Sequence, residues 1–139
     1  MDLEIIESRA EEVKKLSKEL WSDYYYNLKI NTIRENKYYK IELDGKEIGI
    51  IILKLRSGVL YIKDIILKNE SRGNKIGHKT MEFCLDLAQK ENCHKMRVKT
   101  CPEIMPAAYY LYKKHVFIEE AVLKNDYFNK DWVILSKYL

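Results

Sequence analysis

Apolar positions change their spacing several times along the chain. At the start, residues 3–7 alternate weakly and predict a short strand. Ser8 and Glu11 have capping-box spacing, and the apolar residues that follow at helical intervals predict a helix reaching Trp21. The aromatic-rich segment 23–34 is compatible with a second short helix.

In the middle of the chain apolar residues recur at every second position, which is the period of a strand. Residues 39–43 alternate, and Asp44-Gly45 directly after them is the strongest short-range signal for a hairpin. Residues 47–55 and 59–67 predict two further strands, which are separated by a turn at Arg56-Ser57-Gly58. These three strands form a predicted antiparallel meander.

A helical spacing returns from Ile76 to Ala88, and Asn92 is suited to end that helix. The remaining elements to the C-terminus are a strand at 96–100, a helix at 107–114 with Pro106 near its first turn, and two strands at 117–127 and 132–139.

The strand–helix–strand unit over residues 59–100 implies a right-handed crossover between two parallel strands. Since the other strands form hairpins, the fold class is α/β (α+β), with a mixed, mostly antiparallel sheet and helices available for both faces. A chain of 139 residues is long enough for one core, so we expect a single domain over residues 1–139.

The composition fits a folded cytoplasmic protein. Apolar residues make up 47% of the chain, and two prolines and five glycines leave no low-complexity linker. The N-terminus does not resemble a signal peptide, and the apolar stretches 48–53 and 60–67 are too short to span a membrane. The three cysteines are expected to be reduced thiols, and Cys93, His94 and Cys101 lack the spacing of a metal site.

Positive charge is concentrated in one part of the chain. The formal net charge is +4, and residues 68–99 alone hold eight basic against four acidic residues. This surplus indicates an anionic ligand, although a patch that binds RNA or a merely solvated face would also account for it.

The segment 70–79 joins a predicted strand end to a helix start, where free backbone N–H groups attract anions. Gly73 and Gly77 permit close approach, and Arg72, Lys75 and Lys79 add full charges. A phosphate or pyrophosphate would fit, but an ordinary turn explains two glycines about as often. The glycine spacing is neither that of a dinucleotide fingerprint nor that of a Walker loop.

Two motifs follow one another in the second half of the chain. The run LYIKDIILKNESRGNKIGHKTMEF, residues 60–83, is a strand followed by a loop and a helix start, and it resembles the cofactor motif R/Q-x-x-G-x-G/A of the GNAT superfamily of N-acetyltransferases. The run AAYYLYKKHVF, residues 107–117, is similar to its A-x-x-L-Y-x-K-x-G-F helix end. The resemblance covers residues 59–139 best and implies acetyl-CoA as the acyl donor, without a metal.

The resemblance also implies the residues that bind the cofactor. The backbone of Ile65, Ile66 and Leu67 is expected to pair with the pantetheine arm. The pyrophosphate is expected to be held by the loop and helix start, which comprise Arg72, Gly73, Asn74, Lys75, Ile76, Gly77, His78 and Lys79.

The same resemblance implies two catalytic residues. Tyr112 is expected to give a proton to the leaving thiolate, and Asp64 to receive the proton of the amine, directly or through water. A strand charge that faces outward is an equally good interpretation of Asp64, and Glu103 is a second candidate base. Cys101 as a nucleophile would need a base such as His115, which direct transfer makes unnecessary.

Three positions depart from the family pattern. Lys75 replaces a glycine and fits the loop if it adopts helical angles, Met105 replaces an asparagine, and Val116 replaces the glycine before the closing phenylalanine. With valine at 116, that turn cannot rely on a left-handed glycine.

The predicted function is transfer of an acetyl group from acetyl-CoA to a primary amine of a protein or small molecule, by direct attack in a ternary complex. The alternative is a non-catalytic module that senses acyl-CoA. RNA binding is not favoured, because the RNP and KH patterns are missing. Tyr24, Tyr25, Tyr26 and Trp132 are expected to line the acceptor groove or to form contacts of a homodimer.

Overall fold

The computed structural model describes residues 3–25, 33–73 and 75–139. The chain divides into two compact units, residues 1–31 and 32–139, and each is described by itself. A single domain over the whole chain stays a prediction.

The described residues of the first unit contain one helix, α1 (Ala10–Tyr25). The strand predicted for residues 3–7 is wrong, since this segment has no regular structure and meets no partner strand in the described part of its unit. Ser8 does not stand at the N-cap position, because α1 begins two residues later at Ala10; its hydroxyl donates to the carbonyl oxygen of Ile6 at 3.1 Å. Within the helix, the rings of Trp21 and Tyr25 stack with centroids 5.6 Å apart.

The second unit is built on a six-stranded sheet with the order β1-β2-β3-β4-β6-β5. Only β3 and β4 are parallel, so the predicted mixed, mostly antiparallel sheet is confirmed. The strands are β1 (Arg34–Leu43), β2 (Lys46–Arg56), β3 (Val59–Leu67), β4 (Lys95–Thr100), β5 (Ile118–Leu123) and β6 (Trp132–Tyr138).

The predicted meander is confirmed, including both turns. Asp44 and Gly45 have φ of 52° and 79°, the pair of positive values that a type I′ hairpin requires. The second short helix is wrong wherever the structure describes it, because residues 23–25 belong to α1 and Arg34 already lies in β1. The rest of that prediction, residues 26–32, lies outside the described residues.

Two helices pack on one face of this sheet, α2 (Ile76–Lys90) and α3 (Pro106–Lys114). Asn92 ends α2 as predicted: it takes a left-handed φ of 56°, and the next N–H, of Cys93, donates to the carbonyl of Ala88 at 2.9 Å. The predicted strand 117–127 is too long, since β5 ends at Leu123 and the chain forms a short 3-10 helix, η2 (Tyr127–Asn129), before β6.

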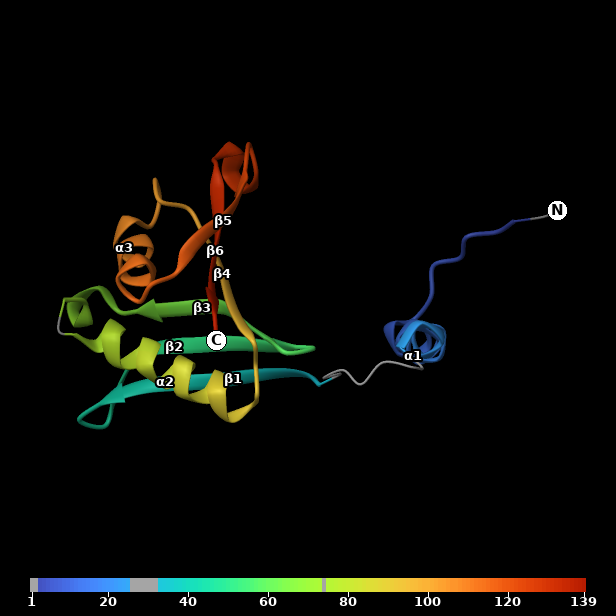
Figure 1. The fold of residues 1–139 in the computed structure, drawn as a ribbon, viewed down its shortest axis with the longest axis horizontal. Coiled ribbons are helices and arrows are strands. Elements are labelled where there is room, and N and C mark those ends of the chain that lie inside the picture. Colours follow the sequence, from blue (N-terminus) through green and yellow to red (C-terminus); the bar gives the residue numbers. More distant parts are fainter. Residues whose placement is uncertain (1–2, 26–32, 74) are drawn as a thin grey trace. The chain divides into compact units, whose positions relative to one another are not determined.

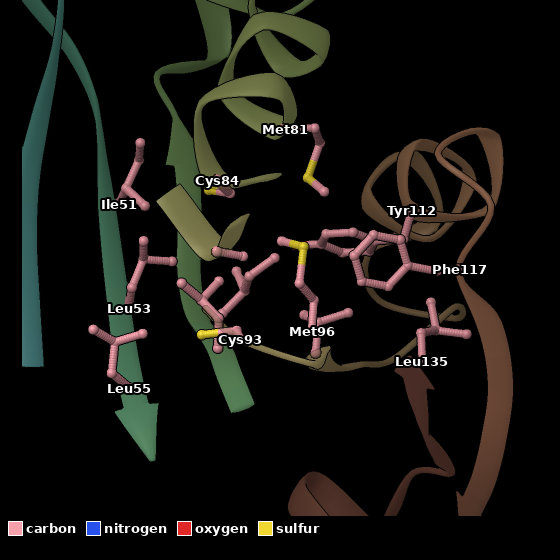
Figure 2. Packing of buried hydrophobic residues seen from close by; sticks show 14 of the residues in the cluster. Ile51, Leu53, Leu55, Met81, Cys84, Cys93, Met96, Tyr112, Phe117 and Leu135 are labelled. Carbon is pink, nitrogen blue, oxygen red and sulfur yellow. The ribbon is translucent and has the colours of Figure 1, made fainter. Parts of the chain in front are cut away.

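The core lies between the sheet and these two helices (Figure 2). Alternate residues of β2 and β4 contribute to it, and Met81 and Cys84 of α2 and Tyr112 of α3 close it from the other side. Cover of the second sheet face by a helix stays a prediction.

Candidate functional site: the opening between β3 and β4

The two parallel strands separate halfway along their length. Their pairing runs from Val59 and Lys95 to Ile62 and Val98 and stops there. Each strand then continues with its outer neighbour, β3 with β2 as far as Leu67 and β4 with β6 as far as Thr100. Figure 1 shows β1–β3 and β4–β6 running in different directions. The backbone of residues 64–67 therefore has no ladder partner on its β4 side.

A bulge aims Asp64 at one side of this opening. Ile62 pairs with Leu53 but Asp64 pairs with Ile52, so Lys63 is an extra residue in β3. Leu53 points into the core, whereas its neighbour Ile52 belongs to the opposite face, and Asp64 shares that face. Bulges commonly re-aim a side chain in this way next to active sites. Asp64 is half-buried beside the opening, on the face away from the core, and its role as a base stays a prediction.

The loop after β3 leads directly to the start of α2. The η1 turn (Asn69–Ser71) comes first, and Arg72 then ties the loop back to the strand, with Nε donating to the carbonyl of Leu67 at 3.3 Å and Nη1 to Oδ1 of Asn69 at 3.3 Å. Gly73 has φ of 87°, and an added Cβ would meet nothing within 4 Å. Asn74 lies outside the described residues.

Lys75 does not adopt helical angles, so that expectation is wrong. Its φ of 60° and ψ of 8° are left-handed, and α2 begins at the next residue, Ile76. This conformation turns the chain into the helix, which explains why the family pattern has a glycine here. The side chain of Lys75, the N-cap residue, does not cap α2, so among the described residues the first N–H groups of the helix are left to meet an anion. Lys75 and Lys79 lie exposed around them.

Gly77 and His78 connect this helix start to α3. A Cβ at Gly77 would lie 3.1 Å from a methyl carbon of Leu111, so this glycine allows the two helices to pack closely. Nδ1 of His78 lies 3.0 Å from Nε2 of His115, which follows α3. Burial lowers the pKa of His115, and His78 and Lys137 lower it further. His78 therefore pairs with a second histidine, which the sequence did not predict.

Tyr112 is buried on the core side of the opening, with only 4% of its surface exposed. Its ring packs against Phe117 with centroids 5.6 Å apart (Figure 2). Burial raises the pKa of the phenol, and the neighbouring Cys84 and Asp64 raise it further. The phenol is therefore protonated at neutral pH.

A charged and aromatic cluster that the sequence did not predict lies beside the opening. Lys99, one residue beyond the last β3–β4 pair, makes an ion pair with Asp126. Its ammonium lies 3.6 Å from the ring centroid of Tyr127 and 5.5 Å from that of Trp132. Lys99 of β4 and the β5–β6 connection come together only in the tertiary fold. Strand alternation in the sequence therefore indicated no role for Lys99 beyond that of an ordinary charged strand residue.

Trp132 is correspondingly buried at 8% exposure, and its indole N–H donates to the carbonyl of Tyr127 at 2.9 Å. The sequence suggested that Trp132 belongs to a broad aromatic surface, but its burial shows that it does not. Tyr24 and Tyr25 lie in the first unit, and Tyr26 lies outside the described residues.

The other candidate reactive side chains are buried or paired with a neighbour. The three cysteines are free and buried. Glu103 makes an ion pair with Lys130 at 2.9 Å. In the described ranges, no three His, Cys, Asp or Glu residues are placed to hold a metal ion, and no helix is long and apolar enough to cross a membrane.

The mixed sheet opens between its two parallel strands, beside the start of α2. This is the arrangement that the resemblance to acyl-CoA-dependent acyltransferases implies. The model of the acetyltransferase (GNAT) family matches residues 3–117. The chain therefore belongs to this family, and its enzyme class is that of an acyltransferase.

Solved structures of acetyltransferases share the fold. An acetyltransferase from Bacillus cereus is 16% identical, with a TM-score of 0.79 over 99% of this chain and 98% of that one. A GNAT family acetyltransferase from Elizabethkingia anophelis, with acetyl-CoA bound, is 20% identical, with a TM-score of 0.68 over 89% and 84%. The ribosomal-protein-S18-alanine N-acetyltransferase from Escherichia coli is 17% identical, with a TM-score of 0.69 over 78% and 72%. A search of the curated proteins gave no significant match.

Proposed function

We propose that this protein transfers an acetyl group from acetyl-CoA to a primary amine by direct attack in a ternary complex. The observation that carries the proposal is the separation of β3 from β4 beyond Ile62 and Val98, next to the start of α2. The acceptor is a protein or small-molecule amine. A cytoplasmic location and a homodimer stay predictions.

The pantetheine arm would lie along residues 65–67. The backbone groups that have no ladder partner on the β4 side would pair with its amides much as a sheet edge accepts an added strand. The pyrophosphate would then reach the first N–H groups of α2, between the charges of Lys75 and Lys79. Arg72 would hold the loop in place through its bonds to Leu67 and Asn69. The bound acetyl-CoA of the Elizabethkingia anophelis structure supports this choice of ligand.

The chemistry would occur where the opening begins. The amine nitrogen attacks the thioester carbonyl, the carbon–sulfur bond breaks, and coenzyme A leaves as a thiolate. Asp64, on the face opposite the core, would receive the proton of the amine directly or through water. The acceptor would thus approach from the Asp64 side, beside the Lys99 cluster.

Tyr112 would act on the sulfur from the core side. A free thiol has a pKa of about 8.5, and the pKa of this phenol lies above the ordinary tyrosine value. Complete proton transfer to the thiolate would therefore be unfavourable. Tyr112 would serve by donating a hydrogen bond that stabilises the thiolate as it forms.

A thiol-release assay with Tyr112→Phe tests the proposed chemistry. The substituted ring keeps its packing on Phe117, and a lost hydrogen bond to a charged atom is worth about 1.5–3 kcal/mol. We expect kcat to fall roughly tenfold to a hundredfold, with nearly unchanged affinity for acetyl-CoA. Wild-type turnover in the variant would remove Tyr112 from its role.

The assay should cover protein N-termini, lysine peptides, polyamines, aminoglycosides and small amino metabolites. The sensor alternative shares the cofactor site and differs only in turnover. If acetyl-CoA binds and every amine of the panel stays unmodified, the result favours the sensor function over catalysis.

A further inference from the structure

Tyr61 of β3 lies on the face of the sheet opposite the core, at the point where the two parallel strands part. It pairs with Lys54 of β2 and with Arg97 of β4. Lys54 follows the core residue Leu53 and so points away from the core, and its partner Tyr61 shares that face. The next pair of the two parallel strands is the last before the opening. Tyr61 is half-buried there, at the closed end of the opening and on the side proposed for the acceptor.

The bulge in β3 brings Asp64 onto the same face as Tyr61. Two residues three positions apart point to opposite faces of a regular strand. The partners of these two side chains on β2 are Lys54 and Ile52, which lie only two residues apart, so the extra residue in β3 removes this difference. Tyr61 and Asp64 are thus successive side chains along one face of β3, with their backbones about 7 Å apart.

The phenol of Tyr61 lies close to charged groups on both sides of this face. Burial raises the pKa of Tyr61, the charge of Lys99 lowers it, and Tyr127 and Asp64 raise it further. Since these charges act on the hydroxyl, it lies within electrostatic reach of both Asp64 and the Lys99 cluster. The phenol is neutral at neutral pH, so it can donate one hydrogen bond while its oxygen accepts another.

We propose that Tyr61 is a further catalytic residue, which relays the proton of the attacking amine to Asp64. This assignment rests on the proposed function and takes the place of a linking water. The phenol oxygen accepts a hydrogen bond from the amine N–H, and the phenol O–H donates to the carboxylate of Asp64. As the carbon–nitrogen bond forms, the amine N–H bond breaks, its proton joins the phenol oxygen, and the phenol proton passes to the carboxylate. The tyrosine is left unchanged, and no further reactant is needed.

Thiol-release kinetics of Tyr61→Phe test the relay, with the panel amine that the wild type acetylates fastest. Phenylalanine keeps the ring and removes only the hydroxyl. We expect kcat/KM for the amine to fall roughly tenfold to hundredfold, because water replaces the relay only in part. The calorimetric affinity for acetyl-CoA should stay within about twofold, because no hydrogen bond to the cofactor is lost.

Tyr39→Phe is the matched control for the loss of a tyrosine hydroxyl. Tyr39 is also half-buried, but its ring packs edge-on against Phe83 with centroids 5.0 Å apart, on the core side of the sheet. This variant should retain the kcat/KM of the wild type.

A cycle of single and double variants separates a relay from a structural role. Asp64→Asn alone should lower kcat/KM, because an amide does not take up the proton. Adding Tyr61→Phe to Asp64→Asn should cost less than about threefold more, because two residues of one relay act as a unit. A hydroxyl that only supports the fold would lower kcat/KM by the same factor with Asp64 present or replaced.

Wild-type turnover in Tyr61→Phe would overturn the relay, as would losses that multiply in the double variant. A wild type that binds no acetyl-CoA, or that binds it and acetylates no amine of the panel, would instead contradict the proposed function. The two failures are therefore distinguishable.

Discussion

Two residues of the site lie in a backbone conformation that their side chains disfavour. Lys75 and Val116 have φ of 60° and 67°, and both stand where the family pattern has glycine. Val116 itself adopts the left-handed conformation that glycine usually provides at this turn. The turn keeps the glycine geometry, because the N–H groups of Val116 and Phe117 still close the end of α3 on the carbonyls of Lys113 and Tyr112.

Val116→Gly should stabilise the protein. A left-handed conformation costs about 1–2 kcal/mol for a residue with a Cβ, and glycine loses about 0.5–1 kcal/mol through its greater freedom in the unfolded chain. Val116 is exposed, so little packing is lost and the net gain should reach about 1 kcal/mol. Denaturant unfolding measures it.

The matched control is Val122→Gly, an exposed valine in β5 that should lower stability. Loss of stability in both variants would show that Val116 carries no strain.

At the scale of elements, the pair of His78 and His115 joins the start of α2 to the end of α3. Groups facing the pair are Glu82, which favours the charged form of His115, and Lys137, which opposes it. Since the pKa of His115 is lowered by folding, the unfolded chain binds its proton more readily. This contribution to stability is complete above the ordinary histidine pKa of about 6.5 and is lost as pH falls below it.

The free energy of unfolding should therefore decrease between about pH 7 and 5, and His115→Gln should flatten that slope. Unfolding curves at several pH values measure it. The control His94→Gln changes an exposed histidine outside the pair and should retain the slope. An unchanged slope in His115→Gln would exclude the pair as its origin.

Elements whose signals are local could be predicted from the sequence. The Asp44-Gly45 hairpin and the start of β3 are correct because turn residues with positive φ, at 44–45 and 57–58, fix where the neighbouring strands end and begin. The strand at residues 3–7 failed for the opposite reason, since a strand forms only with a partner and alternation does not reveal one. The end of β5 was missed because alternation continues past the point where the chain turns at Asn125.

At the scale of the molecule, the site depends on where two strands part. Sequence motifs pointed to the loop at residues 72–79 and to Tyr112, because those residues occur in the family pattern. The bulge at Lys63 and the opening beyond Ile62 arise from long-range pairing. No local pattern encodes them, so only the structure could show them.

The most direct test of the account is calorimetry of acetyl-CoA binding by the wild type and by a variant that carries Lys75→Gln and Lys79→Gln. We expect micromolar affinity, in the range typical of enzyme substrates. Removing two charges next to the pyrophosphate should weaken binding roughly fivefold to twentyfold.

A control with Lys90→Gln and Lys124→Gln removes the same charge from exposed positions at the far end of α2 and after β5. This control should bind like the wild type. No heat with the wild type, or equal affinity of the two double variants, would contradict the claim that acetyl-CoA is held at the start of α2.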